Sequence, residues 1–290
     1  MMKTFLMNEV QFDIDIEKKS RLNDGGYMEK IQEQLLYTTL RIECFDENDN
    51  IFSIGTGFLL QRPVSDDKYK VYLVSNKHVL CGAKSIALTF TKAKNGEPEI
   101  GNKIVIPFKD IQNNVKGHPD VNVDIALLEC TGIFVLMMEQ MYVKFVPYEM
   151  LATFKEPELS VAENVYFIGY PDNRYDVKNN LPLVRTGMIS SHPKYDYNGD
   201  PVFIIDAQVF PGSSGSPVYI DLTYENFKNG QIVVGGHNIK LLGIVSATMI
   251  RNNQLKAITT ATSIVAEEVL GLGIVFKSTA IKKLVDSMPK

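Results

Sequence analysis

Residues 212–217, Gly-Ser-Ser-Gly-Ser-Pro, have the composition of a loop that could carry out acyl transfer. That chemistry needs a hydroxyl directed at a carbonyl carbon and N–H donors directed at the oxyanion that develops. Strand-like runs at 202–209 and 218–220 flank the loop, and its two glycines allow close approach that a Cβ would hinder. The loop predicts a nucleophile at Ser214, although Gly-Ser segments are also common as plain turns.

A serine hydroxyl is a weak nucleophile unless a base lies beside it, so we looked for a histidine and a carboxylate. The chain has four histidines: His78, His118, His192 and His237. His78 follows the strand-like run 71–75 and is the candidate base. Asp124 stands directly before the apolar run 125–128, where a carboxylate is costly unless it is paired. The alternatives are a histidine with only a local hydrogen bond and an exposed aspartate at a strand start, with Asp120 as a nearby competitor.

The order histidine, aspartate, serine along the chain separates two classes of triad. The reverse class places the serine first, and here Asp221 and His237 do follow Ser214. That class requires a glycine where this chain has Ser216, and it requires alternating strands and helices, which the pattern lacks. The first order is therefore favoured.

Composition limits the kind of partner that this chain can have. Its 290 residues are 45% hydrophobic and 22% charged, with a net charge of −4 and no long basic run. These values argue against nucleic acid or an anionic membrane as the main partner. Three cysteines in apolar surroundings, without zinc-site spacing and without a visible signal peptide, predict reduced thiols and a cytoplasmic protein with no metal and no cofactor.

Short runs rich in β-branched and aromatic residues recur along the chain, separated by turn clusters. The predicted strands are 38–45, 51–60, 70–75, 85–90, 103–108, 122–129, 164–169, 183–190, 202–209, 215–220, 231–235 and 240–248. Helical spacing is visible only at 28–36 and at 279–287. This pattern predicts an all-β barrel or sandwich with a short helix near each end.

Several patches with characteristic sequences follow one another in a fixed order. They are Gly-Thr-Gly-Phe at 55–58, Ser-Asn-Lys-His-Val at 75–79, Asp-Ile-Ala-Leu-Leu at 124–128, Asp-Ala-Gln-Val-Phe-Pro-Gly-Ser-Ser-Gly-Ser-Pro at 206–217, Leu-Gly-Ile-Val-Ser at 242–246 and Gly-Leu-Gly-Ile-Val-Phe at 271–276. Together they resemble the trypsin-like (chymotrypsin-fold) serine peptidases, in style closest to HtrA-type bacterial proteases without PDZ domains.

The resemblance implies two six-stranded antiparallel β-barrels with the site between them. We expect an N-terminal extension at 1–25, which could engage a regulatory protein partner. The first barrel should occupy 26–146, and the second barrel and closing helix should occupy 147–290. The implied activity is that of a serine endopeptidase acting on a protein or peptide substrate, and the open alternative is a latent or inactive protein of the same fold.

The resemblance also assigns roles to residues. His78 is the implied general base, Asp124 the carboxylate that orients it and Ser214 the nucleophile, with the backbone N–H groups of Gly212 and Ser214 as the oxyanion hole. The implied substrate-binding residues are Gln208, Ile244, Val245 and Ser246.

Two positions depart from the family pattern. Ser216 replaces the usual glycine and leaves the loop less free, although its small side chain should fit. Gln208 stands where trypsin-like specificity requires an aspartate, so we expect a small, apolar or polar residue, rather than Arg or Lys, before the scissile bond.

Overall fold

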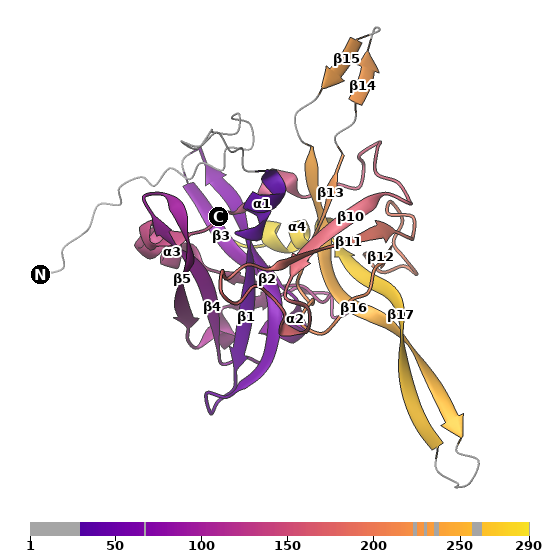
Figure 1. Ribbon diagram of the computed structural model, residues 1–290, viewed down its shortest axis with the longest axis horizontal. Coiled ribbons are helices and arrows are strands. Elements are labelled where there is room, and N and C mark those ends of the chain that lie inside the picture. Colours follow the sequence, from indigo (N-terminus) through magenta and orange to yellow (C-terminus); the bar gives the residue numbers. More distant parts are fainter. Residues whose placement is uncertain are drawn as a thin grey trace, which may run out of the picture.

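The computed structural model describes residues 30–66, 68–222, 225–228, 231–234, 238–256 and 263–289, and side chains are described outside 223–237 and 250–268. The predicted extension at 1–25 and His237 of the alternative triad lie outside these residues. Two β-sheets dominate the structure and lie side by side (Figure 1). The predicted β-rich architecture is confirmed.

The first sheet is formed by the amino-terminal half of the described chain. Its strands are β1 (Thr39–Phe45), β2 (Ile51–Ser65), β3 (Lys68–Ser75), β4 (Ser85–Lys94), β5 (Glu97–Phe108), β6 (Val115–Gly117), β7 (Ala126–Glu129), β8 (Met141–Tyr142) and β9 (Val146–Pro147). They pair in the order β5-β4-β1-β2-β3-β7-β6, with β8 on β4 and β9 parallel to β2. The prediction of a closed six-stranded barrel is wrong for this half, because the sheet is open and β6, β8 and β9, of two or three residues each, add to its six longer strands.

The second sheet is a closed six-stranded barrel, as predicted, in the order β10-β11-β12-β17-β16-β13. Its strands are β10 (Asn164–Gly169), β11 (Leu183–Ile189), β12 (Val202–Asp206), β13 (Pro217–Asp221), β16 (Ile239–Lys256) and β17 (Ser263–Lys277). A separate pair, β14 (Glu225–Lys228) and β15 (Gln231–Val234), projects from it (Figure 1).

The helices are short and lie at the ends and connections of the sheets. They are α1 (Ile31–Leu36), α2 (Lys77–Leu80), α3 (Thr131–Met137) and α4 (Ser278–Asp286), with 3₁₀ turns η1 (Ile111–Asn113), η2 (Met138–Gln140), η3 (Tyr148–Met150) and η4 (Pro171–Asn173). Both predicted terminal helices are present. Along α4, Ile281, Leu284 and Val285 are buried at the predicted helical spacing. No helix in the described ranges is long and apolar enough to cross a membrane.

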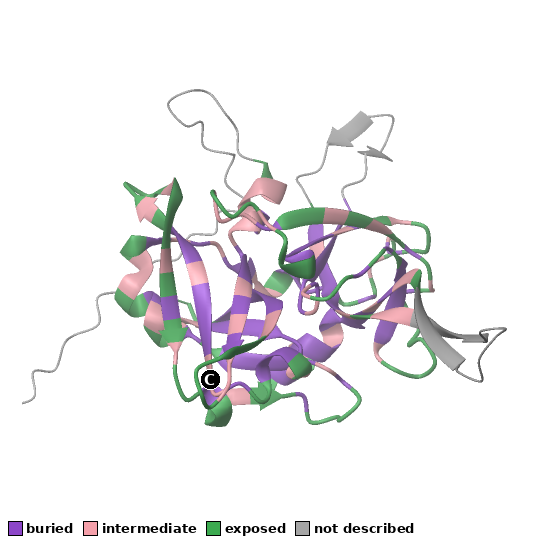
Figure 2. Cartoon of the chain, turned by 60° about the horizontal axis from the view of Figure 1, so that its bottom comes forward, coloured by how far each residue is buried: buried purple, intermediate pink, exposed green. Residues whose placement is uncertain are grey.

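The hydrophobic core joins the two sheets. One buried cluster contains Phe58 and Val74 of the first sheet, Tyr219 of the barrel and Ile281 of α4. Two further clusters lie within the first sheet and within the barrel. Figure 2 shows the buried residues running through the middle of both sheets, with exposed residues at the connecting loops. Because the cluster that contains Phe58 is shared, the two halves hold each other in a fixed arrangement, which a site built from both requires.

Candidate active site

Antiparallel pairing of β3 with β7 brings the predicted base and carboxylate together. Ser75 at the end of β3 pairs with Ala126 at the start of β7, so the residues just beyond these ends lie side by side. The His78 ring Nδ1 lies 2.6 Å from Asp124 Oδ2, and the His78 backbone N–H donates to Asp124 Oδ1 at 3.1 Å. The Asn76 side-chain amide holds the Asp124 carbonyl at 2.6 Å. Asp124 is therefore fixed through its backbone and both carboxylate oxygens.

The carboxylate of Asp124 is held in its charged form. Partial burial raises its pKa, but hydrogen bonds from His78 and Ser246 outweigh that effect, and the pKa lies below its usual value. The competing carboxylate of Asp120 is exposed and accepts a hydrogen bond from Asn122 N–H instead. The alternative in which Asp124 is an unpaired, exposed aspartate at a strand start does not describe this structure.

Ser214 lies in the loop between β12 and β13, opposite the first sheet. Its Oγ donates a hydrogen bond to the Ser246 carbonyl at 3.1 Å. No hydrogen bond links Ser214 Oγ to His78, and both residues are in the described part of the chain. Ser246 also donates its own hydroxyl to Asp124 Oδ2 at 2.8 Å. Ser246 therefore bridges the carboxylate of one half and the predicted nucleophile of the other.

Thr56 of β2 fixes the Ser214 loop to the first sheet. Its N–H donates to the Ser214 carbonyl at 2.9 Å, and its hydroxyl donates to the Gly212 carbonyl at 2.7 Å. The same hydroxyl accepts the Tyr170 N–H at 3.1 Å. Sequence reasoning included Thr56 only in a strand that resembles the family, and it gave no sign that this side chain holds the loop.

The two glycines of the loop are required by its backbone. Gly212 and Gly215 have φ of +84° and +86°, in the region that favours glycine. A Cβ on Gly212 would lie 2.5 Å from the Tyr170 carbonyl oxygen, and one on Gly215 would overlap the Thr56 carbonyl oxygen. Within the described ranges neither the Gly212 N–H nor the Ser214 N–H donates a hydrogen bond. Their role as oxyanion donors stays a prediction.

The departure at Ser216 is accommodated by a glycine on a neighbouring strand. Ser216 is fully buried, and its Oγ occupies the space where a Cβ on Gly169 would lie. The Ser216 N–H donates to the Ser213 carbonyl at 3.0 Å, which keeps the loop closed. The expectation that this small side chain fits is confirmed, and the space it needs is left by Gly169.

The predicted substrate-binding residues lie on β16 and before the Ser214 loop. Ile244 and Val245 are fully buried, and Val245 exchanges two backbone hydrogen bonds with the loop, from its N–H to Ser216 and to its carbonyl from Gly215. Gln208 is exposed directly after β12. Their roles toward a substrate stay a prediction.

Comparisons with known proteins place most of the chain in one family. A family model described as the trypsin-like peptidase domain matches residues 55–225, more than half of the chain. A comparison with curated protein sequences found no significant match.

Solved structures with a similar course of the chain include two bacterial proteases and one human protein. A serine endoprotease from Yersinia pestis is 17% identical, with a TM-score of 0.46, over 87% of this chain and 64% of that one. A protease from M. tuberculosis in its active form is 17% identical, with a TM-score of 0.46, over 100% of this chain and 94% of that one. Human heparin binding protein is 9% identical, with a TM-score of 0.47, over 88% and 92%. This chain thus spans less than two thirds of the Yersinia protein.

Proposed function

Since the chain belongs to the trypsin-like peptidase domain family, we propose that it is an active serine endopeptidase that cleaves peptide bonds in protein substrates. The observation that carries the proposal is the chain of hydrogen bonds from His78 through Asp124 and Ser246 to Ser214. It connects an imidazole from the first sheet to a hydroxyl from the barrel through Asp124 and Ser246, which are distant in sequence.

Each residue has a distinct role in the proposed reaction. Asp124 binds His78 at Nδ1, which leaves Nε2 to accept the Ser214 proton as Oγ attacks the substrate carbonyl. His78 then gives that proton to the leaving amine. In the second half of the reaction His78 takes a proton from water, which attacks the acyl carbonyl, and returns it to Ser214 Oγ as the bond between that oxygen and the acyl group breaks. Asp124 stays charged throughout and stabilises the imidazolium, as its lowered pKa supports.

The oxyanion is bound by the backbone N–H groups of Gly212 and Ser214. Both donors are without a hydrogen bond inside the described structure, and the loop that carries them is fixed by the hydrogen bonds from Thr56. Because these donors are held in place before the substrate arrives, little reorganisation is needed when the oxygen becomes charged.

One observation favours a second candidate, a latent protein of this fold that binds peptides or partners. Ser214 Oγ is bonded to the Ser246 carbonyl and not to His78, so the proton transfer requires the hydroxyl to exchange that bond. In the latent form this exchange takes place only when a regulatory protein engages the chain.

Labelling with a fluorophosphonate probe separates the two candidates. We expect wild-type protein to be labelled at one site, identified as Ser214 by mass spectrometry, and Ser214→Ala to remain unlabelled. Ser213→Ala is the matched control, because it removes a neighbouring buried hydroxyl that has no hydrogen-bond partner among the described residues. An unlabelled wild type that is folded and cleaves no protein substrate would contradict the active-enzyme proposal and favour the latent one.

A further inference from the structure

Arg185 occupies an unusual position on β11. It pairs with Phe167 of β10 and lies on the same face of its strand as Gly187 and Ile189, since side chains alternate along a strand. Ile189 is buried in the barrel core, so this face is directed into the barrel. A charged residue here needs a reason, because a charge that points toward a core is costly unless it is paired.

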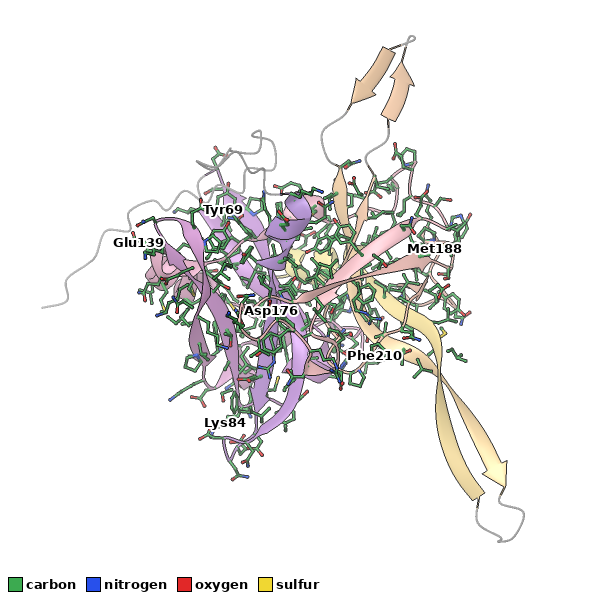
Figure 3. All side chains as sticks on the ribbon, viewed as in Figure 1. Tyr69, Lys84, Glu139, Asp176, Met188 and Phe210 are labelled. Atoms are coloured by element: carbon green, nitrogen blue, oxygen red, sulfur yellow. The ribbon has the colours of Figure 1, made fainter. Side chains whose placement is uncertain are left out.

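Two aromatic rings hold the guanidinium. Its central carbon lies 5.2 Å from the centroid of the Phe167 ring and 5.0 Å from that of Phe210. Such cation–π contacts attract the guanidinium and restrict its orientation. Phe210, labelled in Figure 3, is 40% exposed, so its contact with Arg185 lies near the surface of the molecule.

Among the described residues, the guanidinium of Arg185 has no hydrogen-bond acceptor. Its Nη1 is buried and has no partner, and no carboxylate pairs with the guanidinium anywhere in the described residues. Desolvation lowers the pKa of this guanidinium, yet arginine remains charged in proteins. A buried, charged donor without an acceptor is rare and calls for an explanation, such as a ligand that supplies the acceptor.

The neighbours of Arg185 place it beside the predicted substrate pocket. A Cβ on Gly187 would lie 2.8 Å from that of Ala207, so β11 passes directly against the segment that follows β12. Arg185, two residues before Gly187 on β11, contacts Phe210, which stands between Gln208 and Ser214 in the sequence. The guanidinium therefore adjoins the segment that the family resemblance assigns to the pocket base.

The geometry points to Arg185 as a specificity-determining residue that binds the carboxylate of a Glu or Asp immediately before the scissile bond. The inference rests on the proposed function and names its substrate class. It replaces the expectation, drawn from Gln208 alone, of a small, apolar or polar residue at that position. A guanidinium is planar and charged, and its N–H groups match the geometry in which a carboxylate accepts two hydrogen bonds.

Matched peptide substrates test this assignment. Two fluorogenic peptide series differ only in Glu against Gln, or Asp against Asn, before the cleaved bond. A charge-assisted hydrogen bond at a desolvated site is expected to give the acidic substrate a roughly tenfold to hundredfold higher kcat/KM. Arg185→Gln should remove that preference, and Arg185→Lys should retain part of it. Arg174→Gln is the control, because it deletes an exposed arginine without touching the stack.

The outcomes separate this inference from the proposed function. A wild type that prefers Gln or Asn, or an Arg185→Gln variant that keeps the acidic preference, would overturn the assignment even if Ser214 is labelled by fluorophosphonate. An Arg185→Gln variant that is labelled as wild type but has lost the acidic preference, with part of that preference kept in Arg185→Lys, supports the assignment. If neither Arg185 variant is labelled while the wild type is, the residue is structural and the assignment fails. A wild type that is never labelled rejects the proposed function itself.

Discussion

The two halves of the candidate site are held in different ways. On the first sheet, His78 and Asp124 contact each other directly, and the carboxylate accepts three hydrogen bonds from side chains and backbone. On the barrel, Ser214 is positioned through its backbone, while its hydroxyl is bonded to a carbonyl and not to the base. The proposed acid–base pair is thus already in contact, whereas the hydroxyl of the proposed nucleophile must exchange its hydrogen bond before it can reach the base. Substitutions on the two sides should therefore affect different properties.

The largest effect is expected from Asp124→Asn. The amide keeps the shape but removes the charge and favours the wrong tautomer of His78, so kcat should fall by about 10⁴-fold. Asp120→Asn is the matched control, since the Asp120 carboxylate accepts the Asn122 N–H and, within the described structure, has no hydrogen bond to the His78 ring. Steady-state kinetics on a protein substrate measure the effect. Equal losses in the two variants would mean that the preformed pair is not the source of activity.

Thr56→Val tests the way in which the nucleophile is held. The change keeps the shape but removes the hydroxyl that bonds the Gly212 carbonyl and the Tyr170 N–H, both of which are then left without this partner. The free energy of unfolding should fall by about 1–3 kcal/mol, measured by urea denaturation.

The same change should also slow fluorophosphonate labelling, because the loop loses an anchor. Thr56→Ser keeps the hydroxyl and should restore both properties. If Thr56→Val is as stable and as quickly labelled as wild type, the loop is positioned by other contacts.

The sequence was sufficient for elements whose pattern is long and regular. Barrel strands such as β10 and β12 follow from runs of β-branched and aromatic residues, and the buried face of α4 follows from helical spacing, whereas β17 was anticipated only through the family resemblance of residues 271–276. The helix α3 was missed because Val135 and Leu136 are apolar yet 44% and 78% exposed, which hides the helical period in an apolar run. Strands of two or three residues, such as β8 and β9, are too short to carry a pattern, so the open first sheet could not be foreseen.

In the candidate site, too, some residues could be predicted from the local sequence and others could not. Ser214, His78 and Asp124 lie in short sequence patches with a recognisable composition, and those patches sufficed to propose them. The contacts of Thr56 and Arg185 described above are with residues 18 or more positions away, and nothing in their own neighbourhood indicates those contacts. These contacts depend on how the strands pair, so they can be recognised only in the folded structure.

Ser246→Ala probes the bridge between the halves. It removes the hydroxyl bonded to Asp124 but leaves the carbonyl that accepts Ser214 Oγ, so only the acid–base side is weakened. We expect roughly a tenfold loss of kcat, from one hydrogen bond to a charged group. The acidic limb of the pH–rate profile should also shift, which a merely structural role would not cause. Ser246→Thr should recover the rate, and an unchanged rate and profile in Ser246→Ala would show that the bridge is dispensable.

The smallest expected effect is a loss of folding stability at acid pH, and it comes from a residue next to the first sheet. His118 is buried in the segment that leads to Asp124. Its Nδ1 accepts the Asp120 N–H at 3.2 Å, and its Nε2 has no partner in the described structure. Burial lowers the pKa of His118, and Lys283 of α4 and Lys77 add to the effect, against the opposing hydrogen bond and charge of Asp120. The folded state therefore resists protonation of this ring more than the unfolded state does.

Because the unfolded chain binds the proton more readily, stability is lost as the pH falls below about 6.5, the ordinary pKa of histidine. The lowered pKa of Asp124 acts in the same direction but only as the pH falls below about 4, so a comparison of urea unfolding at pH 7.5 and at pH 5 leaves most of its contribution unchanged. The urea midpoint of His118→Gln should fall less between these pH values than that of wild type, whereas His192→Gln, at an exposed site, should behave as wild type. An equal fall in all three proteins would place the acid sensitivity outside the segment that carries Asp124.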